Sequence, residues 1–133
     1  MFCNYHLDPS LTGKCGRNLL HSASEGGNVV IIETMLSRDL DINSKDSSGN
    51  TSLMIAAFCG KMEAVNYLLE KGADLYLKGQ YGQNLLHKSS HGGNVAIIET
   101  MLSRGLDINS KDSNGNTSLM TAAFSGKIGR AHV

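Results

Sequence analysis

The sequence predicts an all-α solenoid of stacked helix pairs, and two internal repetitions support this prediction. Residues 18–57 recur as residues 84–123, sixty-six positions later, and only seven of these forty aligned pairs differ. A shorter repetition of thirty-three residues relates residues 49–54 to residues 82–87. Such a period is typical of repeat proteins, whose units bury their apolar sides against one another and offer a surface for binding.

Each repeat is predicted to begin with a turn and a short first helix. Residues 46–49, Asp-Ser-Ser-Gly, are the residues that a type I turn favours. Thr51 follows as a helix N-cap, Leu53 and Ala56 fall on one face of the helix, and Gly60 ends it. The turn therefore forms the tip of each repeat.

A second helix follows directly. Val65, Leu68 and Leu69 recur at three- and four-residue spacing, and Gly72 can adopt the left-handed conformation that ends a helix. Residues 75–77 are then expected to run extended towards the next tip. In the following repeat, Asn84 and Asn94 are the expected N-caps of the two helices.

A helix pair this short cannot enclose its own apolar face, so most of the stability is expected to come from the junctions between repeats. The last seven residues lack the apolar pattern of a second helix. The fourth repeat is therefore truncated and should fray. The predicted boundaries are an N-terminal extension over 1–12, repeats over 13–45, 46–78 and 79–111, and the truncated repeat over 112–133.

The repeats resemble the ankyrin repeat, whose signature is Gly-x-Thr-Pro-Leu-His-x-Ala-Ala, a Gly, an apolar second helix and Gly-Ala-Asp-x-Asn. Residues 49–57 read Gly-Asn-Thr-Ser-Leu-Met-Ile-Ala-Ala, Gly60 follows, and residues 72–76 read Gly-Ala-Asp-Leu-Tyr. The resemblance covers about residues 13–127. It implies an ankyrin-repeat solenoid of stacked helix-turn-helix pairs with projecting β-hairpin loops, used to bind other proteins.

The chain departs from this signature in two ways. The family pairs a Thr with a His in one repeat, whereas here two repeat types alternate, one with Thr and Met and the other with Asn and His. We expect Asn18 and Asn84 to bond the rings of His21 and His87. The signature Pro is absent, which should loosen the start of each first helix; its positions hold Leu19, Ser52, Leu85 and Ser118.

Asp39 occupies the place where Gly72 and Gly105 end their second helices. A left-handed backbone at a residue with a side chain costs about 1 kcal/mol. Asp39→Gly is therefore expected to stabilise the protein.

Composition excludes several classes of function. Twelve basic and twelve acidic side chains cancel, so no overall field draws the chain to nucleic acid or to an anionic membrane. Neither a secretion signal nor a membrane-spanning run is apparent, which favours the cytoplasm, or alternatively the nucleus. Cys3, Cys15 and Cys59 fit free thiols in a reducing compartment. We expect a monomer without a cofactor.

The resemblance implies that a partner meets the tips and the exposed side of the first helices. A row of lysines, one before each tip, could also meet an acidic segment, although a solvated row is favoured. The predicted partner-binding residues are Lys14, Arg17, Lys45, Ser47, Ser48, Asn50, Phe58, Lys78, Gln80, Tyr81, Gln83, His91, Lys111, Asn114, Asn116 and Phe124.

Two readings stay open for the aromatic residues Phe58 and Phe124. Each ring could be an exposed anchor for a partner, or could lie against the first helix of the next repeat. For Asn43 and Asn109, which match an asparagine hydroxylated in some ankyrin proteins, the unmodified form is favoured.

No catalytic or metal site is predicted. His87 and His91 lie one helical turn apart, but two ligands do not make a zinc site. The Ser, His and Asp residues fall where caps and turns explain them, which leaves no activated nucleophile. The first hypothesis is thus a non-catalytic interaction module, and the alternative is a regulatory or tethering ankyrin segment of a larger enzyme or channel.

Overall fold

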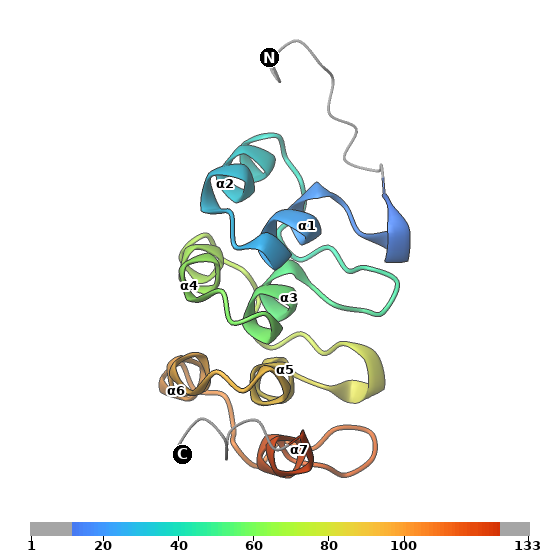
Figure 1. Ribbon diagram of the computed structural model, residues 1–133, viewed down its shortest axis with the longest axis vertical. Coiled ribbons are helices and arrows are strands. Elements are labelled where there is room, and N and C mark those ends of the chain that lie inside the picture. Colours follow the sequence, from blue (N-terminus) through green and yellow to red (C-terminus); the bar gives the residue numbers. More distant parts are fainter. Residues whose placement is uncertain (1–11, 126–133) are drawn as a thin grey trace.

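The protein is a stack of helix pairs, described here from a computed structural model over residues 12–125, apart from the side chains of Lys14, Phe124 and Ser125. Figure 1 shows the first helices of the pairs in one layer, the second helices in another, and the loops projecting beyond the first helices. The predicted all-α solenoid is confirmed. Its helices are α1 (Leu19–Gly26), α2 (Val29–Ser37), α3 (Ser52–Phe58), α4 (Met62–Glu70), α5 (Leu85–Gly92), α6 (Val95–Ser103) and α7 (Ser118–Ser125), with the 3-10 turns η2 (Lys14–Gly16) and η3 (Gln80–Gly82).

The first helices begin at the predicted caps. The Asn84 side chain accepts a hydrogen bond from the His87 backbone N–H at 3.0 Å, and the Thr51 hydroxyl accepts one from the Met54 backbone N–H at 3.3 Å. These bonds satisfy backbone donors that the first turn of a helix leaves without partners. Asn94 caps the second helix α6 in the same way, as predicted.

The ends of the second helices also follow the prediction. Gly72 and Gly105 have φ angles of 93° and 98°, and Asp39 adopts a φ angle of 65° at the equivalent place. Asp39 is thus a residue with a Cβ in a conformation that suits glycine.

The loops differ from the prediction in two respects. Residues 12–125 contain no strand, and the loop at Asp46 is closed by two backbone bonds, one of 2.9 Å from the Asp46 N–H to the Asn50 carbonyl and one of 3.0 Å from the Gly49 N–H to the Asp46 carbonyl. The loops are therefore tight turns, and the β-hairpin form implied by the resemblance is not observed. The extended run expected at residues 75–77 is wrong, because Asp74 accepts a bond from the Tyr76 backbone N–H and folds this segment into a turn.

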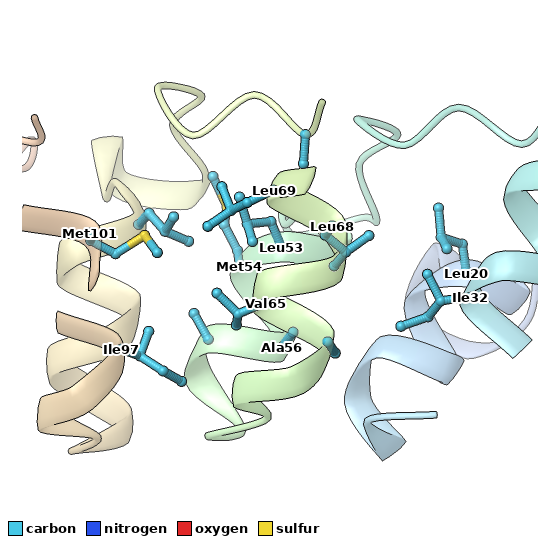
Figure 2. Packing of buried hydrophobic residues seen from close by; sticks show 14 of the residues in the cluster. Leu20, Ile32, Leu53, Met54, Ala56, Val65, Leu68, Leu69, Ile97 and Met101 are labelled. Carbon is cyan, nitrogen blue, oxygen red and sulfur yellow. The ribbon is translucent and has the colours of Figure 1, made fainter. Parts of the chain in front are cut away.

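A single apolar core runs along the stack between the two layers of helices. Figure 2 shows Leu53 on α3, Val65 and Leu68 on α4 and Ile97 on α6 within one continuous cluster. Burying a side chain of this size contributes roughly 1.5–3 kcal/mol. The core thus crosses the junctions between repeats, as the repeat length requires.

Small residues let neighbouring first helices approach closely. Ala56, Ala57, Ser89 and Ser90 are all buried. The Ser89 hydroxyl donates to the Leu85 carbonyl at 2.8 Å, so its burial leaves this polar group satisfied. None of the helices between residues 12 and 125 has the length and apolar character needed to cross a membrane.

Candidate functional site

Two kinds of tip alternate along the projecting edge. In the first kind, Asp46 Oδ1 accepts bonds of 2.9 Å from the backbone N–H groups of both Ser48 and Asn50. Asp112 holds Asn114 and Asn116 in the same way, also at 2.9 Å. One carboxylate therefore fixes each of these turns.

The second kind of tip is a 3-10 turn with a left-handed residue at its centre. Cys15 has a φ angle of 65° and Tyr81 a φ angle of 61°. Each binds the tip that follows it: the Ser47 N–H donates to the Cys15 carbonyl at 2.9 Å, and the Ser113 N–H donates to the Tyr81 carbonyl at 2.8 Å. The Gln80 N–H also donates to the Ser48 carbonyl at 3.2 Å, so each tip is bonded to the next one. The Tyr81 side chain is exposed at this edge.

Two buried histidines tie first helices to loops, and the predicted pairing with asparagine is confirmed. The Asn18 backbone N–H donates to His21 Nδ1 at 3.0 Å, so the ring proton lies on Nε2, which donates to the Ser44 carbonyl at 2.8 Å. In the second copy, the Asn84 N–H donates to His87 Nδ1 at 3.1 Å, and His87 Nε2 lies 2.8 Å from the Asn116 carbonyl. Both ring nitrogens of each histidine therefore contact backbone groups inside the fold.

A groove of about 350 Å³ opens between the tips and the first helices at the middle of the stack. We call it the central groove. Its walls come from three successive tips and from α1, α3 and α5. It is lined by Arg17, Glu25, Asn50, Met54, Ile55, Phe58, Cys59, Gln80, Tyr81, Gln83, Lys88 and His91.

The central groove brings together seven of the predicted partner-binding residues and leaves others outside. The seven are Arg17, Asn50, Phe58, Gln80, Tyr81, Gln83 and His91. The side chains of Lys14 and Phe124 lie outside the described part of the chain. Those that the structure describes but does not place in the groove are Lys45, Ser47, Ser48, Lys78, Lys111, Asn114 and Asn116.

One end of the central groove carries a charge cluster that is already paired. The Arg17 guanidinium lies 3.0 Å from Glu25 Oε1 and 3.3 Å from Asp46 Oδ2. Asp46 is buried, and its other oxygen holds the turn described above. Arg17 therefore pairs with both acidic groups at this end.

The central groove is also lined by Lys88, which the sequence reasoning missed. Lys88 is half-buried, and burial lowers the pKa of its ammonium while the charge of Asp46 opposes this shift. Its ammonium forms no ion pair with any carboxylate in residues 12–125. Lys88 replaces Ser22 of the first copy and His91 replaces Glu25. The difference between the two copies at this position is the sequence signal that could have identified Lys88.

Phe58 combines the two readings that the sequence left open. Its side chain is 41% exposed. Its ring also stacks on His91 of the next first helix, with 5.2 Å between centroids and 22° between planes. Beside it, burial raises the pKa of the Cys59 thiol, and the Glu25 carboxylate adds to this shift. Phe58 therefore exposes apolar surface at the groove and also joins α3 to α5.

The lysine row lies along the stack but away from the groove. Lys45 Nζ donates to the Lys78 carbonyl at 2.9 Å, which links one repeat to the next. Lys45, Lys78 and Lys111 are all exposed. A role of this row in binding stays a prediction.

The groove offers no cluster of metal ligands in the described residues, where no three His, Cys, Asp or Glu side chains come together. His87 cannot serve as one of a pair with His91, because both its ring nitrogens already contact backbone groups.

Comparison with known protein families matches almost the whole described length. The family described as "Ankyrin repeats (3 copies)" matches residues 1–79. The family described as "Ankyrin repeats (many copies)" matches residues 68–122. No curated protein matches the chain.

Proposed function

Because this chain belongs to the ankyrin repeat family, we propose that it is a non-catalytic module that holds a segment of a partner protein in the central groove. Ankyrin repeats generally mediate protein–protein interaction, and the family is typically non-enzymatic. The observation that carries the proposal is the gathering of three tips and three first helices around one groove. A surface made by adjacent repeats suits a partner segment that lies across them.

The charges of the central groove indicate the chemistry of that segment. Glu25 is paired with Arg17, whereas Lys88 is half-buried without an ion pair among the described carboxylates. A partner carboxylate at Lys88 would compensate the desolvation of the ammonium. Phe58 and Tyr81 offer exposed aromatic surface, the kind of side chain that anchors interfaces. We infer a partner segment with an acidic side chain next to an apolar one.

The experiment measures binding itself, because the groove would serve an adaptor or a tethering segment of a larger enzyme or channel equally well. Peptides are selected on the wild-type protein from a random displayed library, and their dissociation constants are measured by calorimetry. Lys88→Ser restores the residue of the first copy, and we expect it to weaken binding and to reduce the effect of salt. Tyr81→Ala should weaken binding by about tenfold or more.

Two matched variants act as controls. Tyr76→Ala removes an exposed aromatic side chain outside the groove, and Lys111→Ser removes a member of the lysine row. Selected peptides that bind all four variants as tightly as the wild type would refute the groove as the site. A loss confined to Lys111→Ser would move the site to the lysine row.

A further inference from the structure

The N-terminal end of the stack exposes apolar side chains that the same sequence buries in the middle. Leu19 on α1 is 48% exposed, whereas its counterpart Leu85 on α5 is 1% exposed. Ile31 on α2 is 42% exposed, whereas its counterpart Ile97 on α6 is fully buried. Figure 2 shows Ile97 directed towards α3 and α4, the preceding pair of helices. Leu19 and Ile31 therefore mark the side of a repeat that a preceding repeat covers.

The C-terminal end exposes the complementary side. Helix α7 repeats the sequence of α3 through Phe124 with one change, Thr121 for Ile55. Leu119 and Met120 of α7 are 59% and 54% exposed. Their counterparts Leu53 and Met54 of α3 are 1% and 2% exposed. This surface of α7 is the side that a following repeat covers.

The two ends match each other because of the sixty-six-residue copy. The copy of α3 lies sixty-six residues later and is α7, whereas the copy of α5 lies sixty-six residues earlier and is α1. The close packing of α3 on α5 inside the chain therefore has its counterpart in α7 of one molecule against α1 of another. Of the three differences between α1 and α5, two place Lys88, Glu25 and His91 at the central groove, and the third exchanges the small residues Ala23 and Ser89.

Two glycines support this pairing. A Cβ added to Gly92 of α5 would collide with the Phe58 backbone carbonyl of α3. A Cβ added to the counterpart Gly26 of α1 would meet nothing within 4 Å. Only a second helix seated on α1, with its Phe124 backbone in the place of Phe58, would make a side chain at Gly26 collide.

We propose that this protein associates head to tail, with α7 of one copy seated on α1 of the next copy. The contact continues the junction already present between α3 and α5, and it is heterologous, so that it can extend beyond a dimer. The packing between first helices is closer than that between second helices throughout the stack. Helix α7 therefore offers the main part of the junction by itself. This proposal departs from the monomer expected from the sequence.

The test uses two blocked variants of the full chain in sedimentation velocity. Leu19→Glu blocks the N-terminal end, and Met120→Glu blocks the C-terminal end; both positions are exposed in the single chain. Each variant alone should stay monomeric, and their equimolar mixture should form a dimer of twice 14.2 kDa. The mean mass of the wild-type protein should rise as the protein concentration rises.

A second variant and a control guard against misfolding. Gly26→Ala should keep the helical content of the wild type and weaken self-association by about tenfold or more. Val30→Glu changes an exposed residue whose counterpart Ala96 is exposed as well, and it should leave self-association unchanged. A wild type that stays monomeric at all concentrations would overturn the proposal. So would a mixture of blocked variants at the monomer mass, or self-association of either blocked variant alone.

Discussion

The two copies, residues 18–57 and 84–123, have nearly the same sequence but different surroundings. Leu85 is buried against the preceding repeat, whereas its counterpart Leu19 is half-exposed at the end of the stack. Gly92 abuts a neighbouring backbone, whereas Gly26 has open space around it. The comparison teaches that the contribution of a residue in this fold is set by the neighbouring repeat rather than by its own helix.

The largest difference between the copies should come from the leucines. Leu85→Ala is expected to lower the free energy of unfolding by about 2–5 kcal/mol, because it leaves a cavity in the junction. Leu19→Ala should cost roughly 1 kcal/mol, since much of this side chain is already in water. Urea unfolding at low protein concentration measures both. Equal losses would contradict the comparison.

The glycines should give the next largest effect. Gly92→Ala is expected to destabilise the protein by about 1–3 kcal/mol, because the added methyl group forces α5 away from α3. Gly26→Ala should be neutral or stabilising by up to about 1 kcal/mol, because alanine favours the helix. The same unfolding experiment compares them, and a destabilised Gly26→Ala variant would mean that α1 has a neighbour already in the single chain.

A smaller effect is expected at the ends of the second helices. Asp39→Gly should stabilise the protein by about 1 kcal/mol and raise the melting temperature by a few degrees, because glycine relieves the left-handed backbone. Gly105→Asp should lower the melting temperature by a similar amount, since this substitution introduces the aspartate that the other copy has at this place. Thermal unfolding followed by circular dichroism checks this pair. An unchanged melting temperature in both variants would show that this position bears no strain.

The smallest effect concerns the tip at Asp112. The Asn116 backbone N–H lowers the pKa of the Asp112 carboxyl, desolvation opposes this, and the Asn114 N–H adds to the lowering. The carboxylate therefore stabilises this turn above the pKa of an unfolded aspartate, about 3.9, and the contribution is lost as the pH falls through the lower folded value. A carboxyl titration followed by NMR should give a midpoint below that of a free aspartate. A midpoint at or above it would remove this account of the turn.

Much of the fold follows from the sequence because caps and turns are local. Thr51 and Asn84 cap their helices as predicted, since each needs only the next three residues to do so. The left-handed backbone at Asp39 was predictable for the same reason, by comparison with Gly72 and Gly105.

The features that the sequence did not reveal depend on contacts between repeats. The left-handed backbone of Tyr81 accompanies a bond to Ser113 in the following tip, thirty-two residues later. The half-buried state of Lys88 and the stacking of Phe58 on His91 likewise depend on residues of a neighbouring repeat. Periodicity places a side chain on a face but does not determine how much of that face is covered.

Native-state hydrogen exchange of the wild-type chain at low protein concentration tests most directly whether the junctions carry the stability. Helices α5 and α1 share five of their eight residues, so the protection of identical amides can be compared directly. We predict much slower exchange in α5, which has a repeat on both sides, than in α1, and slower exchange in α4 than in α7. Equal protection of α1 and α5 would contradict the account.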